Sequence, residues 1–237
     1  MGGFVRRLED LRYIFNEFGQ QTIDFRDELI VAEYDNKQLA NIEGERRLAE
    51  EMGIEAQHRV IEFGPGTGAL SLAMAEMCQH VYAVDTSQAM LNYIDKSARK
   101  LGVDNVSTHH GGFLSYEHGY EPVDFIVTKF AFHHLPEMWK AVALTKFNRM
   151  LKQGGLFYLH DVIFSFPPDE YEQAIDRWID EVTQTSGWSR EEFEVHVNEE
   201  FSTFSWILEG LIRDSGFKIV KASYWTDTYG SILAEKI

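Results

Sequence analysis

The 237-residue sequence has little cysteine and no long apolar run. Its single cysteine, Cys78, excludes an internal disulfide and is typical of a protein from a reducing compartment. No stretch approaches the roughly 20 uninterrupted apolar residues that a membrane-spanning helix requires. We therefore expect a cytoplasmic protein that does not bind a membrane.

Positive charge is also scarce. The chain has 22 lysines and arginines against 38 aspartates and glutamates, which leaves a net charge of −16. Nucleic acids and anionic membranes attract proteins through clusters of basic residues, because binding there releases condensed counterions. The sequence therefore disfavours a nucleic-acid partner and favours a small-molecule one. The oligomeric state does not follow from these numbers.

Short β-branched runs alternate with longer helical patterns along most of the chain. This alternation is typical of parallel βαβ units. It predicts an α/β fold, a doubly wound Rossmann-like sheet of seven strands, mostly parallel with an antiparallel last strand. The seven predicted strands are 59–63, 80–84, 106–109, 123–128, 156–162, 217–222 and 231–236. The last two are too close in sequence for a helical crossover, so they should form an antiparallel hairpin.

The chain is expected to form a single domain, 1–237, built from four parts. Residues 1–52 and 167–203 are helical in pattern but lie outside the alternation, and we interpret them as caps over the carboxyl edge of the sheet. Residues 53–166 would form the nucleoside-binding core. Residues 204–237 would supply the last helix and the closing hairpin. The helix before the fifth strand is expected to carry Leu144, Phe147 and Leu151 on one face.

A glycine-rich turn joins the first strand to its helix. Gly64, Gly66 and Gly68 would allow the turn to form and a ligand to approach the backbone closely. Asp85 follows Gly64 by 21 residues, at the tip of the next strand, where a carboxylate can accept hydrogen bonds from both hydroxyls of a ribose. Turn, helix and spaced acid together predict an adenosine-containing ligand.

The glycine spacing helps to identify that ligand. A dinucleotide site has the pattern Gly-x-Gly-x-x-Gly, whereas here the sixth position is Ala69. Glu62, just before the turn, would repel a phosphate but suits a ligand that carries an ammonium group. These features favour S-adenosylmethionine over NAD.

Three stretches resemble the class I S-adenosylmethionine-dependent methyltransferases, and specifically their small-molecule branch. Residues 60–69 are similar to the first motif of that family. Residues 123–127, followed by Phe-His-His-Leu-Pro at 132–136, resemble its fourth-strand region. Residues 151–155 resemble its Leu-Lys-Pro-Gly-Gly turn, with Gln153 in place of proline.

The resemblance implies which residues contact the donor and its product, S-adenosylhomocysteine. The three glycines would shape the methionine and ribose side of the pocket, and Asp85 would hold the ribose. Many relatives carry Gly-Asp-Ala after the third strand, where the aspartate contacts the adenine amino group. This chain has Gly111-Gly112-Phe113, so that acid is missing, and backbone groups would have to replace it. The full set of predicted cofactor-binding residues is Glu62, Gly64, Gly66, Gly68, Asp85, Thr86, Gly112, Phe113 and Lys129.

Catalytic candidates should lie at the carboxyl ends of the fourth and fifth strands. His133, His134 and Asp161 occupy those positions and could serve as a general base or line the acceptor pocket. Adjacent histidines also raise the possibility of a metal site. Neighbours in sequence usually point in different directions, and no second cluster has ligand spacing, so we expect no metal.

The resulting hypothesis is an enzyme that transfers a methyl group from S-adenosylmethionine to a small molecule. The alternatives are a methyltransferase-like module that binds the nucleoside without turnover, methylation of a macromolecule, and a nicotinamide oxidoreductase. The glycine spacing and the closing hairpin disfavour the oxidoreductase.

Overall fold

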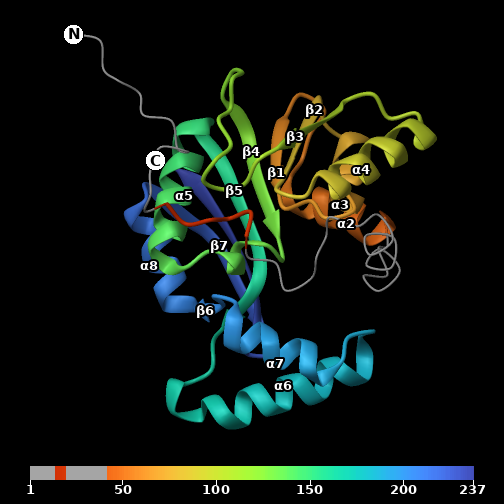
Figure 1. The fold of residues 1–237 in the computed structure, drawn as a ribbon. Coiled ribbons are helices and arrows are strands. Elements are labelled where there is room, and N and C mark those ends of the chain that lie inside the picture. The colour runs from red at the N-terminus through yellow and green to blue at the C-terminus, as the bar shows by residue number, and fades with distance from the viewer. Residues whose placement is uncertain (1–13, 20–41) are drawn as a thin grey trace.

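The computed structural model describes residues 14–19 and 42–237, and its sheet divides the molecule into two helical layers. Figure 1 shows the twisted sheet between the helices of the two faces. None of the helices in the described residues is both long and apolar enough to cross a membrane. Residues 1–13 and 20–41, which hold most of the predicted N-terminal cap, lie outside the described residues.

The first half of the chain builds the parallel part of the sheet. Its strands are β1 (Arg59–Phe63), β2 (His80–Asp85), β3 (Val106–His110), β4 (Val123–Lys129) and β5 (Leu151–Phe164). They lie in the order β3-β2-β1-β4-β5, and all four neighbouring pairs are parallel. The order reverses beside β1, so a crevice opens at the carboxyl ends of β1, β2 and β4, which is where open α/β sheets bind their ligands.

A hairpin of two strands, antiparallel to each other, completes the sheet. They are β7 (Phe217–Trp225) and β8 (Tyr229–Lys236), and β8 lies between β5 and β7. The predicted α/β sheet of seven strands with an antiparallel last strand is confirmed. The described chain has one further short strand, β6 (Thr203–Phe204), which pairs with the end of β5.

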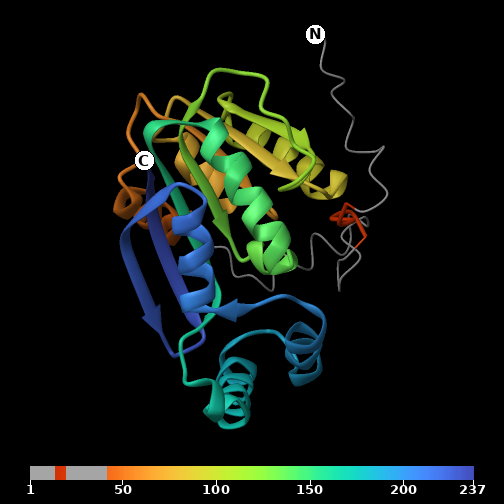
Figure 2. The same cartoon turned by 90° about the vertical axis from the view of Figure 1, so that its left-hand side faces the viewer.

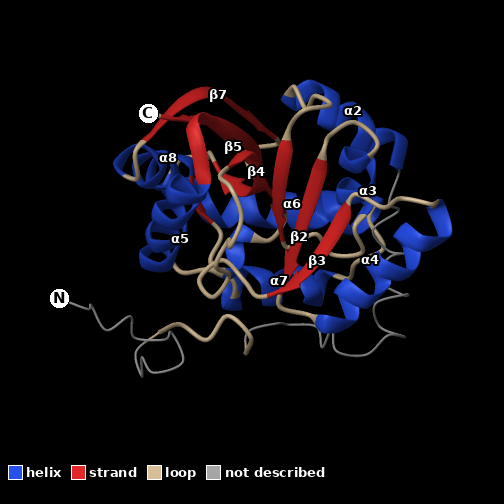
Figure 3. Cartoon of the chain, turned by 90° about the horizontal axis from the view of Figure 1, so that it is seen from above, coloured by secondary structure: helices blue, strands red, loops and turns tan. Residues whose placement is uncertain are grey.

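Helices cover both faces of the sheet, as the view from above in Figure 3 shows. One face carries α2 (Ile42–Met52), α3 (Ala69–Ala75) and α4 (Gln88–Leu101). The other face carries α5 (Glu137–Met150) and α8 (Ser205–Asp214). Side chains alternate between two cores, with Val60 and Val81 on the α3 side and Ile61 and Phe63 on the α5 side. This alternation follows from the period of two along each strand.

The predicted boundary between α5 and β5 was wrong. We expected Leu151 on the apolar face of a helix, whereas α5 ends at Met150 and Leu151 begins β5. Its backbone is extended, with φ −81° and ψ 146°, and it pairs with Val123. The pairing register shifts between Val123 and Phe125, and Gly154 has a φ of +74°. The Gly154-Gly155 pair therefore belongs to a bulge within β5 and does not end a helix.

The insertion at 167–203 is helical, as predicted. It contains η3 (Pro168–Glu170), α6 (Tyr171–Thr185) and α7 (Arg190–Glu199), which lie beyond the carboxyl end of the sheet in both Figure 1 and Figure 2. Trp178 of α6 is 2% exposed and packs against Phe164 and Phe193. The extended end of β5 thus anchors the insertion through its own small aromatic core.

Candidate functional site

The glycine turn connects β1 to α3 at the crevice. Gly64, Gly66 and Gly68 all have positive φ, at +66°, +55° and +86°. A Cβ on Gly64 would lie 2.4 Å from Cβ of Ala131, and one on Gly68 would lie 2.6 Å from Cγ1 of Ile94. Gly64 and Gly66 line a pocket here, whereas Gly68 ends the turn at the N-terminus of α3.

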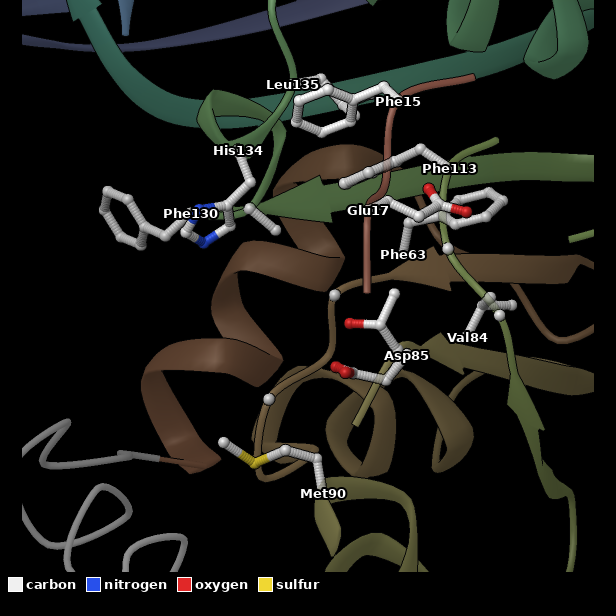
Figure 4. A pocket seen from close by; sticks show the side chains of 16 residues that line it. Phe15, Glu17, Phe63, Val84, Asp85, Met90, Phe113, Phe130, His134 and Leu135 are labelled. Atoms are coloured by element: carbon white, nitrogen blue, oxygen red, sulfur yellow. The ribbon is translucent and has the colours of Figure 1, made fainter. Parts of the chain in front are cut away.

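Asp85 lies at the end of β2 on the same pocket, which we call the Asp85 pocket. Its Oδ1 accepts a hydrogen bond from the backbone N–H of Ser87 at 2.8 Å. Burial raises the pKa of Asp85 to about 6, even though backbone hydrogen bonds from Ser87 and Gly66 favour the ionised form. Figure 4 shows Asp85 and Met90 among the side chains that line the pocket. Thr86 also lines the pocket.

Gly112 and Phe113 form another wall of the pocket. Phe113 is also a core residue, because it is 8% exposed and its ring stacks on Phe63 with the centroids 5.5 Å apart. Gly112 is in contact with an acidic side chain from the N-terminal segment, Glu17.

Glu17 was not among the predicted site residues. Its Oε2 accepts the N–H of Leu114 at 2.9 Å and its Oε1 accepts the N–H of Ser115 at 2.8 Å. The carboxylate therefore lies on the loop after β3, where the sequence lacks the expected acid, and it lines the Asp85 pocket (Figure 4). Nothing in the local pattern around Glu17 signals this contact, because about a hundred residues separate the two segments.

Glu62 and Lys129 lie outside the residues that line this pocket. Glu62 is 2% exposed and accepts a hydrogen bond from the hydroxyl of Ser71 on α3. Burial raises the pKa of Glu62 to about 7. Lys129 points to α2, where its Nζ is 2.5 Å from Oε1 of Glu45. This ion pair directs the Lys129 side chain away from the residues that line the pocket, and its contact with the donor stays a prediction.

The three catalytic candidates divide between the pocket and the interior behind it. His134 lines the pocket, next to Phe130 and Leu135. His133 is buried, and its Nδ1 is 2.5 Å from Oδ1 of Asp161, whose Oδ2 accepts the backbone N–H of His133 at 3.1 Å. Asp161 therefore orients His133 and does not line the pocket.

The protonation of the two histidines differs. Burial acts to lower the pKa of His133, but the charge and hydrogen bond of Asp161 outweigh it and raise this pKa above its ordinary value. Burial lowers the pKa of His134 to about 4, and the neighbouring His133 acts in the same direction. His134 is therefore neutral at pH 7.

The expectation that the two histidines point in different directions was wrong. Both belong to a single turn of 3₁₀ helix, η2 (Phe132–His134), which brings their ring centroids to 4.3 Å. Both also face Glu200, at the end of α7. Its Oε2 is 3.2 Å from Nε2 of His133, and its Oε1 is 3.9 Å from Nδ1 of His134. Glu200 was also missed, because only the folding of the insertion onto the sheet brings it there.

Of the described N-terminal residues, Phe15 and Glu17 line the pocket, and Phe15 contacts the insertion. Phe15 lines the Asp85 pocket, and its ring contacts Phe201 at 6.1 Å between centroids. Within the described ranges, the lining of this pocket comes from 15–17 and from the sheet core, not from 167–203.

Comparisons with known proteins find methyltransferases similar to this chain. A family model described as a methyltransferase domain matches residues 60–155. An uncharacterized methyltransferase of Geobacillus sp. (strain WCH70) is 31% identical over 160 residues, which cover 68% of this chain and 70% of that protein.

Two solved structures have a similar fold. The first is a SAM-dependent methyltransferase from Aquifex aeolicus, with a TM-score of 0.64 and 20% identity, and the match covers 89% of this chain and 99% of that one. The second is the N-methyltransferase NodS from Bradyrhizobium japonicum WM9 in complex with S-adenosyl-L-homocysteine. Its TM-score is 0.57 at 13% identity, and the match covers 80% of this chain and 83% of that one.

Proposed function

Because this chain belongs to the class I S-adenosylmethionine-dependent methyltransferases, we propose that its Asp85 pocket binds the donor and that the acceptor is a small molecule. The observation that carries the proposal is the meeting of Asp85, the turn at Gly64 and Gly66, and Gly112 around one pocket. NodS, whose fold is similar, was solved with the product S-adenosylhomocysteine, which supports the same ligand here.

Asp85 and the glycine turn suit the ribose and the methionine portion of the donor. The carboxylate of Asp85 accepts backbone hydrogen bonds from Ser87 and Gly66 and would accept further hydrogen bonds from the ribose hydroxyls. The absence of a Cβ at Gly66 lets the ligand approach the backbone of the turn. Hydrogen bonds to a charged acceptor are worth about 1.5–3 kcal/mol each, so Asp85 would supply much of the donor affinity.

Glu17 suits the adenine. A carboxylate offers about four acceptor positions, and the two backbone N–H groups of Leu114 and Ser115 use only two of them. The remaining positions can accept a hydrogen bond from the exocyclic amino group of adenine. Glu17 would thus replace the acid that relatives carry after the third strand.

Phe130, His134 and Phe15 would form the acceptor side. Phe130 has a φ of +52°, which a bulky residue rarely adopts, and its backbone N–H donates to the carbonyl of His160 at 2.8 Å. Strained positions of this kind cluster at functional sites, and Phe130 lines the pocket while its ring packs against those of His160 and Tyr229. The mixture of apolar rings and one neutral imidazole suits a small acceptor that is partly apolar.

The reaction needs alignment more than acid–base assistance. The acceptor atom attacks the methyl carbon, the carbon–sulfur bond breaks, and its electron pair returns to sulfur, which leaves S-adenosylhomocysteine. The sulfonium is already a good leaving group, so holding the acceptor in line and excluding water supply most of the acceleration. An acceptor that carries a proton would lose it to water or to the neutral His134.

A labelling experiment tests the proposal. The protein is incubated with S-adenosylmethionine carrying a ¹³C methyl group and a metabolite extract, and small molecules, protein and nucleic acid are then analysed separately by mass spectrometry. We expect the label in a small molecule with the wild type and its loss with Asp85→Ala. Label in the protein or nucleic-acid fraction would contradict the small-molecule acceptor. Donor binding without transfer would indicate a module without turnover.

A further inference from the structure

Beside the Asp85 pocket, three side chains from two distant parts of the chain converge on one point. They are His133 and His134 of η2 and Glu200, which follows α7. One nitrogen or oxygen of each lies within 4.8 Å of the others. None of these atoms is needed for the nucleoside half of the proposed function.

The three groups lie close enough together to share one divalent metal ion after small side-chain adjustments. An ion bound tetrahedrally at about 2.0–2.2 Å holds neighbouring ligand atoms about 3.4 Å apart. The separation between Nε2 of His133 and Oε2 of Glu200 is 3.2 Å, and that between Nδ1 of His134 and Oε1 of Glu200 is 3.9 Å. His134, whose side chain is 35% exposed, is the most accessible of the three and can adjust.

The surrounding residues orient these ligands in the manner of a metal site. Nδ1–H of His133 donates to Asp161, which leaves the lone pair of Nε2 directed toward Glu200. A carboxylate that fixes the tautomer of a ligating histidine is a common arrangement behind bound metals. His196, four residues before Glu200 on α7, contacts the same carboxylate through Nδ1, while its Nε2 is 2.9 Å from Oγ of Ser202. Two of the three ligands thus have a partner that holds them in place.

We propose that His133, His134 and Glu200 bind one divalent transition-metal ion, of which Zn²⁺ fits best. Two imidazoles and a carboxylate are a usual ligand set for Zn²⁺, and three protein ligands leave a fourth position open. Because His134 also lines the Asp85 pocket, the ion lies next to the proposed acceptor side. The open position would take an oxygen, nitrogen or sulfur of the acceptor. This last step rests on the proposed function, and in it the ion, not His134, would favour loss of the acceptor's proton.

Metal binding can be measured without donor or acceptor, so its outcome is independent of the methyl-transfer assay. Protein without a polyhistidine tag is stripped with a chelator and titrated with ZnCl₂ by calorimetry. Co²⁺ is then added as a spectroscopic probe. We expect one Zn²⁺ per chain and the visible absorption bands of four-coordinate Co²⁺. Absence of stoichiometric Zn²⁺ would overturn the proposal, and His133 would then be an imidazolium held between Asp161 and Glu200.

Variants locate the site. His134→Phe and Glu200→Gln each remove a ligand and should lower Zn²⁺ affinity at least 100-fold. Asp161→Asn, which changes only the positioning of His133, should lower it about 10- to 100-fold. His80→Gln is the matched control, because His80 lies at the start of β2, away from the carboxyl ends of the strands, and should leave the affinity unchanged.

Circular dichroism checks that each variant is folded. If Glu200→Gln does not fold, the partly exposed His134→Phe still decides the question. Wild-type affinity in His134→Phe, or an equal loss in His80→Gln, would contradict a site at these residues.

Discussion

Glu17 and Gly112 are in direct contact, and the contact depends on the missing side chain of the glycine. A Cβ on Gly112 would lie 2.5 Å from Oε2 of Glu17. The lack of a side chain at Gly112 therefore leaves room for the carboxylate of Glu17 from the N-terminal segment.

Glu17→Gln should weaken donor binding. The amide keeps the size of the side chain but loses the charge and half of the acceptor positions, and hydrogen bonds to charged groups are worth about 1.5–3 kcal/mol. We expect the affinity for S-adenosylhomocysteine to fall about tenfold by calorimetry. Glu117→Gln is the control, because Glu117 lies on the same loop but pairs with Lys146 at the surface. Equal affinities of Glu17→Gln and the control would remove Glu17 from the donor site.

Donor binding should depend on pH through Asp85. Its pKa is about 6 in the unliganded protein because the carboxyl is buried, and only the ionised form accepts both ribose hydroxyls. The affinity for S-adenosylhomocysteine should therefore be constant at pH 7–8 and should fall as the pH drops through 6. Asp85→Asn, which does not titrate, should bind at least about tenfold more weakly at pH 8 and show a flatter profile. A profile unchanged by this substitution would mean that the ribose lies elsewhere.

Glu62→Gln should stabilise the protein at alkaline pH. Burial raises the pKa of Glu62 from 4.5 to about 7. Between these two pH values, the carboxyl group is therefore protonated in the folded state and ionised in the unfolded state. The stability contribution of this group therefore decreases as the pH rises from 4.5 to 7 and stays low above 7. We expect the two proteins to be equally stable near pH 4, and the variant to be more stable by roughly 3 kcal/mol at pH 8, at 1.36 kcal/mol per pKa unit.

Urea denaturation of both proteins across this range provides the measurement for Glu62. Subtracting the pH dependence of the unfolding free energy of the wild type from that of the variant cancels the titration of every other group. A difference that does not change with pH would show that Glu62 titrates normally in the folded protein.

Gly64→Ala should destabilise the fold more than Gly102→Ala. Both glycines have positive φ, at +66° and +71°, so both substitutions carry a backbone cost of about 1–2 kcal/mol. Only at Gly64 would the new Cβ also meet Ala131, at 2.4 Å, whereas nothing lies within 4 Å at Gly102. We expect an additional cost of roughly 1–3 kcal/mol for Gly64→Ala in urea denaturation. Equal losses would indicate that the turn can move away from Ala131.

Local pattern was sufficient for much of the core. The short β-branched runs at 59–63 and 123–127 and the helical patterns between the strands predicted the mostly parallel α/β sheet that the structure has. The glycine turn and Asp85 were also identifiable, because a tight turn after a strand and an acid at the tip of the next one are local features that parallel pairing brings together. The bulge at Leu151 was missed because an apolar residue one turn after Phe147 fits a helix face equally well.

Only the tertiary structure shows the long-range contacts around the site. Glu17 reaches the loop after β3, Glu200 reaches His133 and His134, and Lys129 turns to Glu45. Each contact joins segments that are more than sixty residues apart. Charge and hydrogen bonding act over a few ångströms and carry no periodicity along the chain. Such partners become visible only when the packing of the apolar faces has brought their segments together.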